Sequence, residues 1–299
     1  MTGSALFDHR HLLGAPVRDR IIKEVQDYVK AQSSIGKLVS ISIAGPPEVA
    51  VYIRNQARLA EKAGIPFDEQ IWEGDITQEE CKARLQAMND DPEVLGIILQ
   101  RPVPPQINVR SLQSAIHPLK DVEGMNPASI GNIVYSDVAL APCTAAASVE
   151  LIKETGLSLE GLEVVMIGHS EIVGRPAAMM LMAEGATVTI CHHMTRSVPM
   201  HSRRADVVVV AVGVPHLIGA DMIKPGAAVI DIGINQITND AGEMEIVGDV
   251  DTQAVTQVAG WITPVPGGVG PMTIACLLAN TVTACCRIHN LPESDAFTS

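Results

Sequence analysis

The stretch that decides the fold is Glu163-Val164-Val165-Met166-Ile167-Gly168-His169-Ser170-Glu171-Ile172-Val173-Gly174-Arg175-Pro176. Its first five residues form a short apolar run, and the run Ala177–Met182 that follows the stretch has helical spacing. A strand, a tight turn and a helix in this order surround an anion with backbone N–H groups, which is how many proteins bind the pyrophosphate of a dinucleotide. The turn departs from G-x-G-x-x-G, because Ser170 replaces the second glycine and Gly174 comes one residue late. The prediction of a dinucleotide site therefore also depends on the strand-rich half that this stretch opens.

Runs of Val and Ile recur through this half and predict the rest of its sheet. They are Glu163–Ile167, Ala186–Cys191, Asp206–Val212 and Ala227–Ile232. Continuous β-branched runs without polar alternation are typical of strands that are buried on both faces. We therefore expect a Rossmann-like, doubly wound sheet in this half.

The earlier half also alternates strand-like and helix-like runs, which predicts a second α/β domain. The runs are Lys37–Ile43, Glu48–Ala63, Phe67–Trp72, Gln78–Met88 and Val94–Leu99. A chain of 299 residues is long enough for two domains. We place the boundary at Pro142-Cys143-Thr144, which gives domains of residues 1–142 and 143–279. A C-terminal helix within residues 280–299 is expected to pack back on the first domain.

A stiff loop precedes the last helix-like run, Thr273–Ile288. The loop Pro264–Met272 holds three prolines and three glycines. Proline fixes the backbone, and glycine lets another backbone or a flat ligand come close. We expect this loop to line a binding site.

Composition limits the class of partner. The net charge is −13, which argues against a nucleic-acid partner, because binding to phosphates requires a basic face. The longest apolar run, Ala205–Val214, is too short to span a bilayer, and no signal-peptide pattern opens the chain. Six cysteines without a C-x-x-C pair indicate buried thiols in a reducing compartment, and nine histidines show no metal-ligand spacing. We expect a cytoplasmic protein without a metal, a membrane or a nucleic-acid partner.

The residues after the second strand of the C-terminal sheet indicate which dinucleotide binds. NAD-specific sites usually carry Asp or Glu there to bind the ribose 2′-hydroxyl. Here the strand ends Cys191-His192-His193-Met194-Thr195-Arg196, without a carboxylate. Arg196 and the two histidines can instead meet a 2′-phosphate, although neutral histidine is a weak phosphate ligand. The sequence therefore favours NADP over NAD.

Six segments agree in order and spacing with one known family. They are His117–Gly124, Pro142–Thr144, Gly168–Pro176, Asp231–Asn235, Val247–Val250 and Pro264–Met272. Over nearly its whole length the chain resembles the methylenetetrahydrofolate dehydrogenase/cyclohydrolase (FolD-type) family. The resemblance implies two α/β domains with a folate cleft between them, tetrahydrofolate derivatives as substrates, a cofactor on the C-terminal domain and a homodimer.

The resemblance also implies which residues form the sites. The candidate catalytic residues are Tyr52, Gln56, Gln100 and Asp121. Substrate binding adds Leu99, Arg101, Pro266, Gly267, Gly268, Val269 and Gly270. The candidate cofactor-binding residues are Thr144, Gly168, His169, Ser170, Val173, Gly174, Arg175, His193, Arg196, Gly213 and Ile234.

One position departs from the family in a way that changes the chemistry. The family carries Tyr-x-x-x-Lys on a helix, whereas this chain has Tyr52 and Gln56, which we expect on one helical face. Val49 and Arg101 also differ from the usual family residues. Hydride transfer depends mainly on placement, whereas addition of water to the methenyl carbon benefits from a titratable group. Glutamine has no proton to exchange in the relevant pH range.

The leading hypothesis is an NADP-dependent enzyme of one-carbon metabolism that oxidises 5,10-methylenetetrahydrofolate, with a weak or absent cyclohydrolase step. A rewired but fully bifunctional dehydrogenase/cyclohydrolase is the first alternative. A dehydrogenase for another small substrate and a non-catalytic folate- or nucleotide-binding homologue are the others. The retained Tyr52, Gln100 and Asp121 argue against the non-catalytic alternative.

Overall fold

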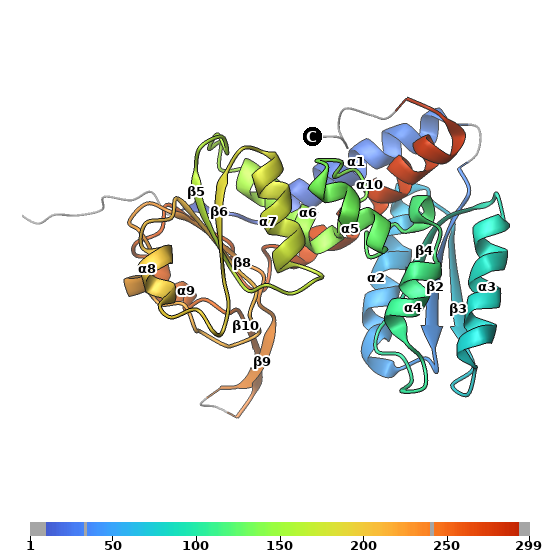
Figure 1. Ribbon diagram of the computed structural model, residues 1–299, viewed down its shortest axis with the longest axis horizontal. Helices are drawn as coiled ribbons and strands as arrows, with labels where there is room; N and C mark the ends of the chain where they lie inside the picture. The colour runs from blue at the N-terminus through green and yellow to red at the C-terminus, as the bar shows by residue number, and fades with distance from the viewer. Residues whose placement is uncertain (1–9, 33–34, 240–241, 293–299) are drawn as a thin grey trace, which may run out of the picture. The chain divides into compact units, whose positions relative to one another are not determined.

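The computed structural model describes residues 10–32, 35–239 and 242–292, and these fold into two compact α/β units (Figure 1). The first unit contains residues 10–18 and Thr144–Thr273. The second contains Asp19–Cys143 and residues 274–292. The two-domain α/β class predicted from the sequence is confirmed.

The first unit is built on a six-stranded parallel sheet in the order β1-β11-β8-β7-β5-β6. The strands are β1 (Arg10–His11), β5 (Glu163–Ile167), β6 (Thr187–Cys191), β7 (Val207–Val210), β8 (Ala228–Asp231) and β11 (Trp261–Ile262). The chain runs from β5 to β6 on one side and then crosses to β7 on the other, so the order reverses at β5. Parallel α/β sheets bind ligands beyond the carboxyl ends of the strands at such a reversal.

Helices of the first unit cover its sheet, and α7 (Gly174–Ala183) packs against β5 and β6. The others are α6 (Cys143–Lys153), which begins at the last residue of the second unit, α8 (Val198–Ser202), α9 (Thr252–Val255) and the 3-10 turn η2 (Ala220–Met222). Strands β7 and β8 are buried along their whole length. The prediction of burial on both faces is wrong for β6, where Thr187 and Ile190 are exposed because β6 is an edge strand.

Two features of the first unit have no counterpart in the sequence-based prediction. Strands β9 (Asn235–Thr238) and β10 (Met244–Val247) form an antiparallel ribbon. At the other end of the chain, β1 pairs with β11, and the Gly14 N–H donates to the Gly267 carbonyl at 2.9 Å. Residues 10–18 therefore belong to this unit and not to the predicted domain 1–142.

The second unit holds a three-stranded parallel sheet in the order β3-β2-β4. Its strands are β2 (Lys37–Ile43), β3 (Phe67–Trp72) and β4 (Val94–Leu99), which match the three predicted runs. Its helices are α2 (Pro47–Ala63), α3 (Gln78–Asp90), α4 (Val109–Ala115) and α5 (Pro127–Val134), with a 3-10 turn η1 (Pro118–Lys120) and, across the division at Arg18, most of α1 (Gly14–Ala31). Side chains of β2, β4, α3 and α4 form an apolar core of this unit.

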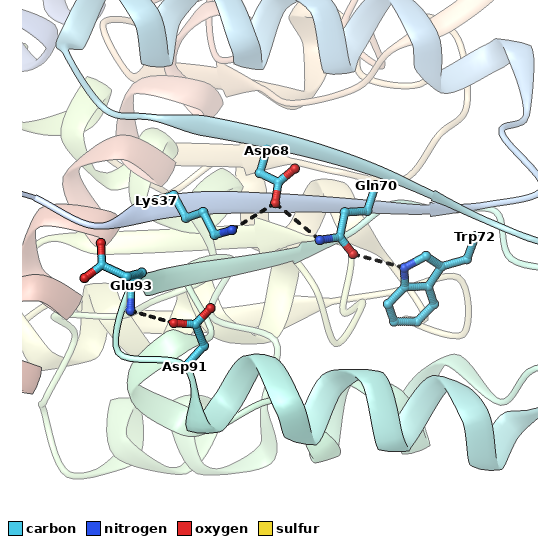
Figure 2. Close-up of polar contacts among 6 residues, drawn as sticks. All are labelled: Lys37, Asp68, Gln70, Trp72, Asp91 and Glu93. Atoms are coloured by element: carbon cyan, nitrogen blue, oxygen red, sulfur yellow. Dashed lines mark hydrogen bonds and ion pairs between the residues drawn. The ribbon is translucent and has the colours of Figure 1, made fainter.

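Strand β3 is the exposed edge of this sheet and carries a row of polar side chains (Figure 2). Lys37 Nζ lies 3.2 Å from Asp68 Oδ2, which also accepts from Gln70 Nε2 at 3.3 Å. The Trp72 indole N–H donates to Gln70 Oε1 at 3.2 Å, and the Arg84 guanidinium lies over the Trp72 ring. Charged and polar groups of this kind protect a sheet edge from pairing with another chain.

Helix α10 (Gly270–His289) returns to the second unit from residue 274 onward. Its Asn280 amide donates to the carbonyls of Val122 and Ala141 at 2.9 and 3.0 Å, and Arg287 pairs with both oxygens of Asp137. The return thus starts earlier than the predicted residue 280, and residues 293–299 lie outside the described chain. By length and composition α10 could cross a membrane, but 72% of its most apolar window is buried inside the protein.

Candidate active site and cofactor site

A buried amide cluster lies at the carboxyl end of β4. Gln100 Nε2 donates to Gln56 Oε1 at 2.8 Å and to Ser40 Oγ at 3.0 Å. The Gln100 backbone N–H donates to Ile41 on β2, which fixes the residue at the end of the sheet. Gln56 is fully buried, and its Nε2 has no hydrogen-bond partner among the described residues. Leaving a buried amide N–H without an acceptor is costly, so this atom is an exception among the polar groups of the site.

Tyr52 stands one helical turn before Gln56 on α2 and is 39% exposed. Its ring is therefore accessible to solvent, whereas Gln56 is enclosed by the protein. Val49, at the start of the same helix, is buried at 8% exposure.

Asp121 is one of the candidate catalytic residues, but its carboxylate already accepts hydrogen bonds from neighbouring residues of the protein. Its Oδ2 accepts from the Asn126 N–H at 2.6 Å and from the Ser129 hydroxyl at 2.8 Å. Burial raises the pKa of Asp121, and the hydrogen bonds from residues 124–129 oppose that rise. At 2% exposure, this side chain holds the turn that leads into α5.

Lys120, beside Asp121, is also used structurally. Its ammonium group donates to the carbonyls of Met88 and Asp91 at 3.0 and 2.7 Å, where it caps the carboxyl end of α3. Burial lowers the pKa of this amine. Lys120 therefore does not replace a lysine at position 56.

Glu123 is the titratable residue that the sequence analysis missed. Its Oε2 accepts from the Leu99 N–H at 3.2 Å, directly beside Gln100. Burial raises the pKa of Glu123 to about 7, Asp121 adds to the rise, and the Arg101 charge opposes it. The segment Lys120-Asp121-Val122-Glu123-Gly124 contains two acidic residues. Asp121 was predicted to belong to the site, and Glu123, two positions later, was overlooked.

A cavity of about 620 Å³ lies in the first unit, beyond the carboxyl ends of β5, β6 and β7. Four predicted cofactor residues line it, and they are Gly168, His169, Ser170 and His193. Its position at the reversal of strand order is the expected one for a dinucleotide.

The turn after β5 is as tight as the glycines suggested. A Cβ on Gly168 would lie 2.1 Å from the Ala211 carbonyl oxygen, and one on Gly174 would lie 2.2 Å from the Gly168 oxygen. Ser170 Oγ accepts from the N–H groups of Val173 and Gly174 at 3.2 and 3.3 Å. Two of the backbone N–H groups that were expected to face a phosphate thus donate to the serine hydroxyl instead.

Three histidines come together at the mouth of this cavity. His169 follows β5, and His192 and His193 follow β6. Their ring centroids are 4.6, 5.8 and 6.2 Å apart. Burial lowers the pKa of His169, and the charges of His192, Arg175 and His193 lower it further.

Other predicted site residues lie elsewhere in the first unit. A smaller cavity of about 180 Å³ is lined by Ile234 together with Pro266, Gly267, Gly268, Val269 and Gly270. Thr144 is the second residue of α6 and lines neither cavity. Val173, Gly174, Arg175, Arg196 and Gly213 are not among the lining residues either, although Arg175 is close enough to His169 to lower its pKa.

Two buried aspartates explain the glycine-bearing motifs Asp231–Asn235 and Val247–Val250. Asp249 accepts from the backbone N–H groups of residues 212, 213 and 214 at 2.6, 3.0 and 3.0 Å, and from Asn235 Nδ2. Asp231 accepts from Gly233, Asp249 and Val250, and burial raises its pKa to about 6. A Cβ at Gly248 would lie 1.8 Å from Asp231 Oδ2. These motifs therefore position the loop after β7.

Comparison with known proteins decides the family. The model of the tetrahydrofolate dehydrogenase/cyclohydrolase catalytic domain matches residues 12–123, and the model of its NAD(P)-binding domain matches residues 142–289. The chain belongs to this family. A bifunctional protein FolD 3 of Roseobacter denitrificans is 76% identical to it over 277 residues, which cover 93% of this chain and 96% of the relative. The bifunctional FolD of Rhodobacter capsulatus is 68% identical over 93% of each chain.

Solved structures of FolD proteins have the same fold as this family member. The Campylobacter jejuni enzyme superposes with a TM-score of 0.87 at 36% identity, covering 94% of this chain and 99% of the other. The Trypanosoma brucei enzyme, described as complexed with NADP and an inhibitor, gives 0.85 at 32% identity, covering 93% and 97%. The names of the relatives support the fully bifunctional alternative better than loss of the cyclohydrolase step.

Proposed function

We propose that this protein is a bifunctional, NADP-dependent methylenetetrahydrofolate dehydrogenase and methenyltetrahydrofolate cyclohydrolase that acts as a homodimer in the cytoplasm. Two family models together match most of the chain, and relatives at 76% and 68% identity carry the bifunctional name. The observation that carries the proposal is the set of polar groups at the end of β4, where Gln100 donates to Gln56 and Glu123 accepts from the Leu99 N–H.

In the dehydrogenase step a hydride leaves the methylene carbon, and the flanking nitrogens stabilise the cation that forms. This step needs placement more than proton transfer. Tyr52 offers an accessible ring for packing on the pterin, and the enclosed Gln56 amide holds Gln100 in place through its hydrogen bond. These roles do not require a titratable residue at position 56.

In the cyclohydrolase step water adds to the methenyl carbon and loses a proton, and opening of the ring leaves a formyl group on one nitrogen. Glu123 takes the role of the titratable group in place of the family lysine. A carboxylate with a pKa of about 7 is suited to accept a proton near neutral pH and to return it to the leaving nitrogen. Asp121 keeps the structural role that its hydrogen bonds give it.

The cofactor is NADP, held in the cavity of the first unit. The cavity lies at the reversal of strand order, and among the described residues no carboxylate lines it to bind a free 2′-hydroxyl. His169 and His193, which line the cavity, supply donors for a 2′-phosphate, and a homologous structure is described with NADP bound.

One assay tests the proposal. Purified protein is mixed with methylenetetrahydrofolate and NADP, and the absorbances of NADPH and of the methenyl intermediate are followed together. We expect NADPH to form while the concentration of methenyltetrahydrofolate stays low, because the cyclohydrolase step consumes it. Accumulation of the methenyl compound would instead support the dehydrogenase with a weakened second step, and no NADPH would contradict both.

A further inference from the structure

The three histidines at the mouth of the cofactor cavity come together through the sheet register. β5 and β6 are parallel neighbours with Ile167 opposite Cys191. His169 and His193 each lie two residues beyond that pair, so the register brings the turns that carry the histidines to the same edge of the sheet. His169 and His192 are 23 positions apart in the sequence, so no short metal-ligand motif predicts the cluster.

We propose that His169, His192 and His193 form a binding site for one divalent transition-metal ion of the zinc type. One ligand nitrogen from each ring lies within 4.8 Å of the other two. Some point therefore lies within about 2.8 Å of all three nitrogens, which is 4.8 Å divided by √3. A Zn–N bond is about 2.0–2.1 Å long, so each ring needs to move inward by less than about 1 Å.

The chemistry of the cluster selects the class of ion. Imidazole nitrogen binds zinc, copper and nickel well, whereas magnesium and calcium require oxygen ligands. Three histidines with open positions for water are a known arrangement for zinc. The cavity beside the rings has room for those waters, and a net charge of −13 favours approach of a cation. The charge of Arg175, which acts on His169, opposes that approach.

His192 is the weakest of the three ligands. Its Nδ1 accepts a hydrogen bond from the Met194 N–H at 3.1 Å. Whichever nitrogen binds the metal, this bond is lost, because Nδ1 then either coordinates the ion or carries the ring proton. Met194 is 74% exposed, so water can replace the partner. The geometry therefore makes His169 and His193 the main ligands.

The test uses the untagged, nucleotide-free full chain, so it does not depend on the proposed enzymatic activity. Zn²⁺ titrated at pH 7.5 in a calorimeter is expected to bind once per chain. His169→Asn and His193→Asn should each weaken binding by more than tenfold, because even loss of a supporting partner typically costs about 10–100-fold. His192→Asn should have a smaller effect. Co²⁺ should give a visible spectrum of nitrogen coordination, and Mg²⁺ should give no binding.

His201→Asn is the matched control, since His201 lies on α8 in the same unit outside the cluster. It should bind Zn²⁺ as the wild type does. His193 is exposed, so its replacement leaves the fold intact, and far-UV circular dichroism checks each variant. The proposal is overturned if the wild type binds no single ion, or if the His169→Asn/His193→Asn double variant keeps the wild-type affinity.

Discussion

Replacing Glu123 by Gln should remove a pH dependence from the stability of the second unit. Burial raises the pKa of Glu123 from 4.5 to about 7. A shift of about 2.5 units corresponds to on the order of 3 kcal/mol, at about 1.4 kcal/mol per unit. Because the side chain is not completely enclosed, this figure is an upper limit.

The sign follows from linkage. The folded state holds the Glu123 proton more tightly than the unfolded state, so the stabilisation is complete below pH 4.5 and is lost as the pH rises through about 7. Glu123→Gln carries no such proton. The variant should therefore gain up to about 3 kcal/mol relative to the wild type between pH 5 and pH 8.

The measurement uses urea unfolding followed by the fluorescence of Trp72, which is 3% exposed in the second unit. A Trp261→Phe background removes the signal of the other unit. Glu69→Gln, an exposed carboxylate on β3, is the control and should show the same pH profile as the wild type. Parallel profiles for Glu123→Gln and the wild type would refute the reasoning.

The other predictions concern the reaction, the cofactor and the loop after β7. Gln56→Lys should raise the cyclohydrolase rate by less than about tenfold, because Glu123 already supplies a titratable group; a gain near 10²-fold in steady-state assays would mean that the wild type lacks one. NADP should bind more tightly than NAD in parallel fluorescence titrations at pH 7.5, and His193→Ala should reduce the preference. Asp249→Ala should cost at least about 3 kcal/mol in urea unfolding followed by Trp261, because three backbone donors lose their acceptor. A cost below 1 kcal/mol would show that water replaces the carboxylate.

The strands were predictable because their signal is local. Continuous runs of Val and Ile mark β7 and β8, and the runs chosen for β2, β3 and β4 have the observed bounds. The pairing of β1 with β11 was not predictable, because a two-residue strand has no pattern and its partner lies 251 residues away, from Arg10 to Trp261. The prediction that β6 is buried on both faces was wrong for a related reason, because the sequence does not show which strand lies at the edge of the sheet.

The site was harder to predict because its chemistry depends on which way a turn points its side chains. Asp121 and Glu123 are two residues apart, and both are acidic. Only the fold shows that Asp121 satisfies the amides before α5, whereas Glu123 meets the free N–H at the outer edge of β4. The histidine cluster likewise requires the register of two strands.

The high pKa of Glu123 follows from a balance between burial and one nearby cation. A cation within about 4–6 Å lowers the pKa of a carboxyl group by about 1–3 units. Arg101 is the cation that lowers the pKa of Glu123, and it does not overcome the effects of burial and of Asp121, which raise it. Because burial prevails over the Arg101 charge, Glu123 is able to gain and lose a proton near pH 7.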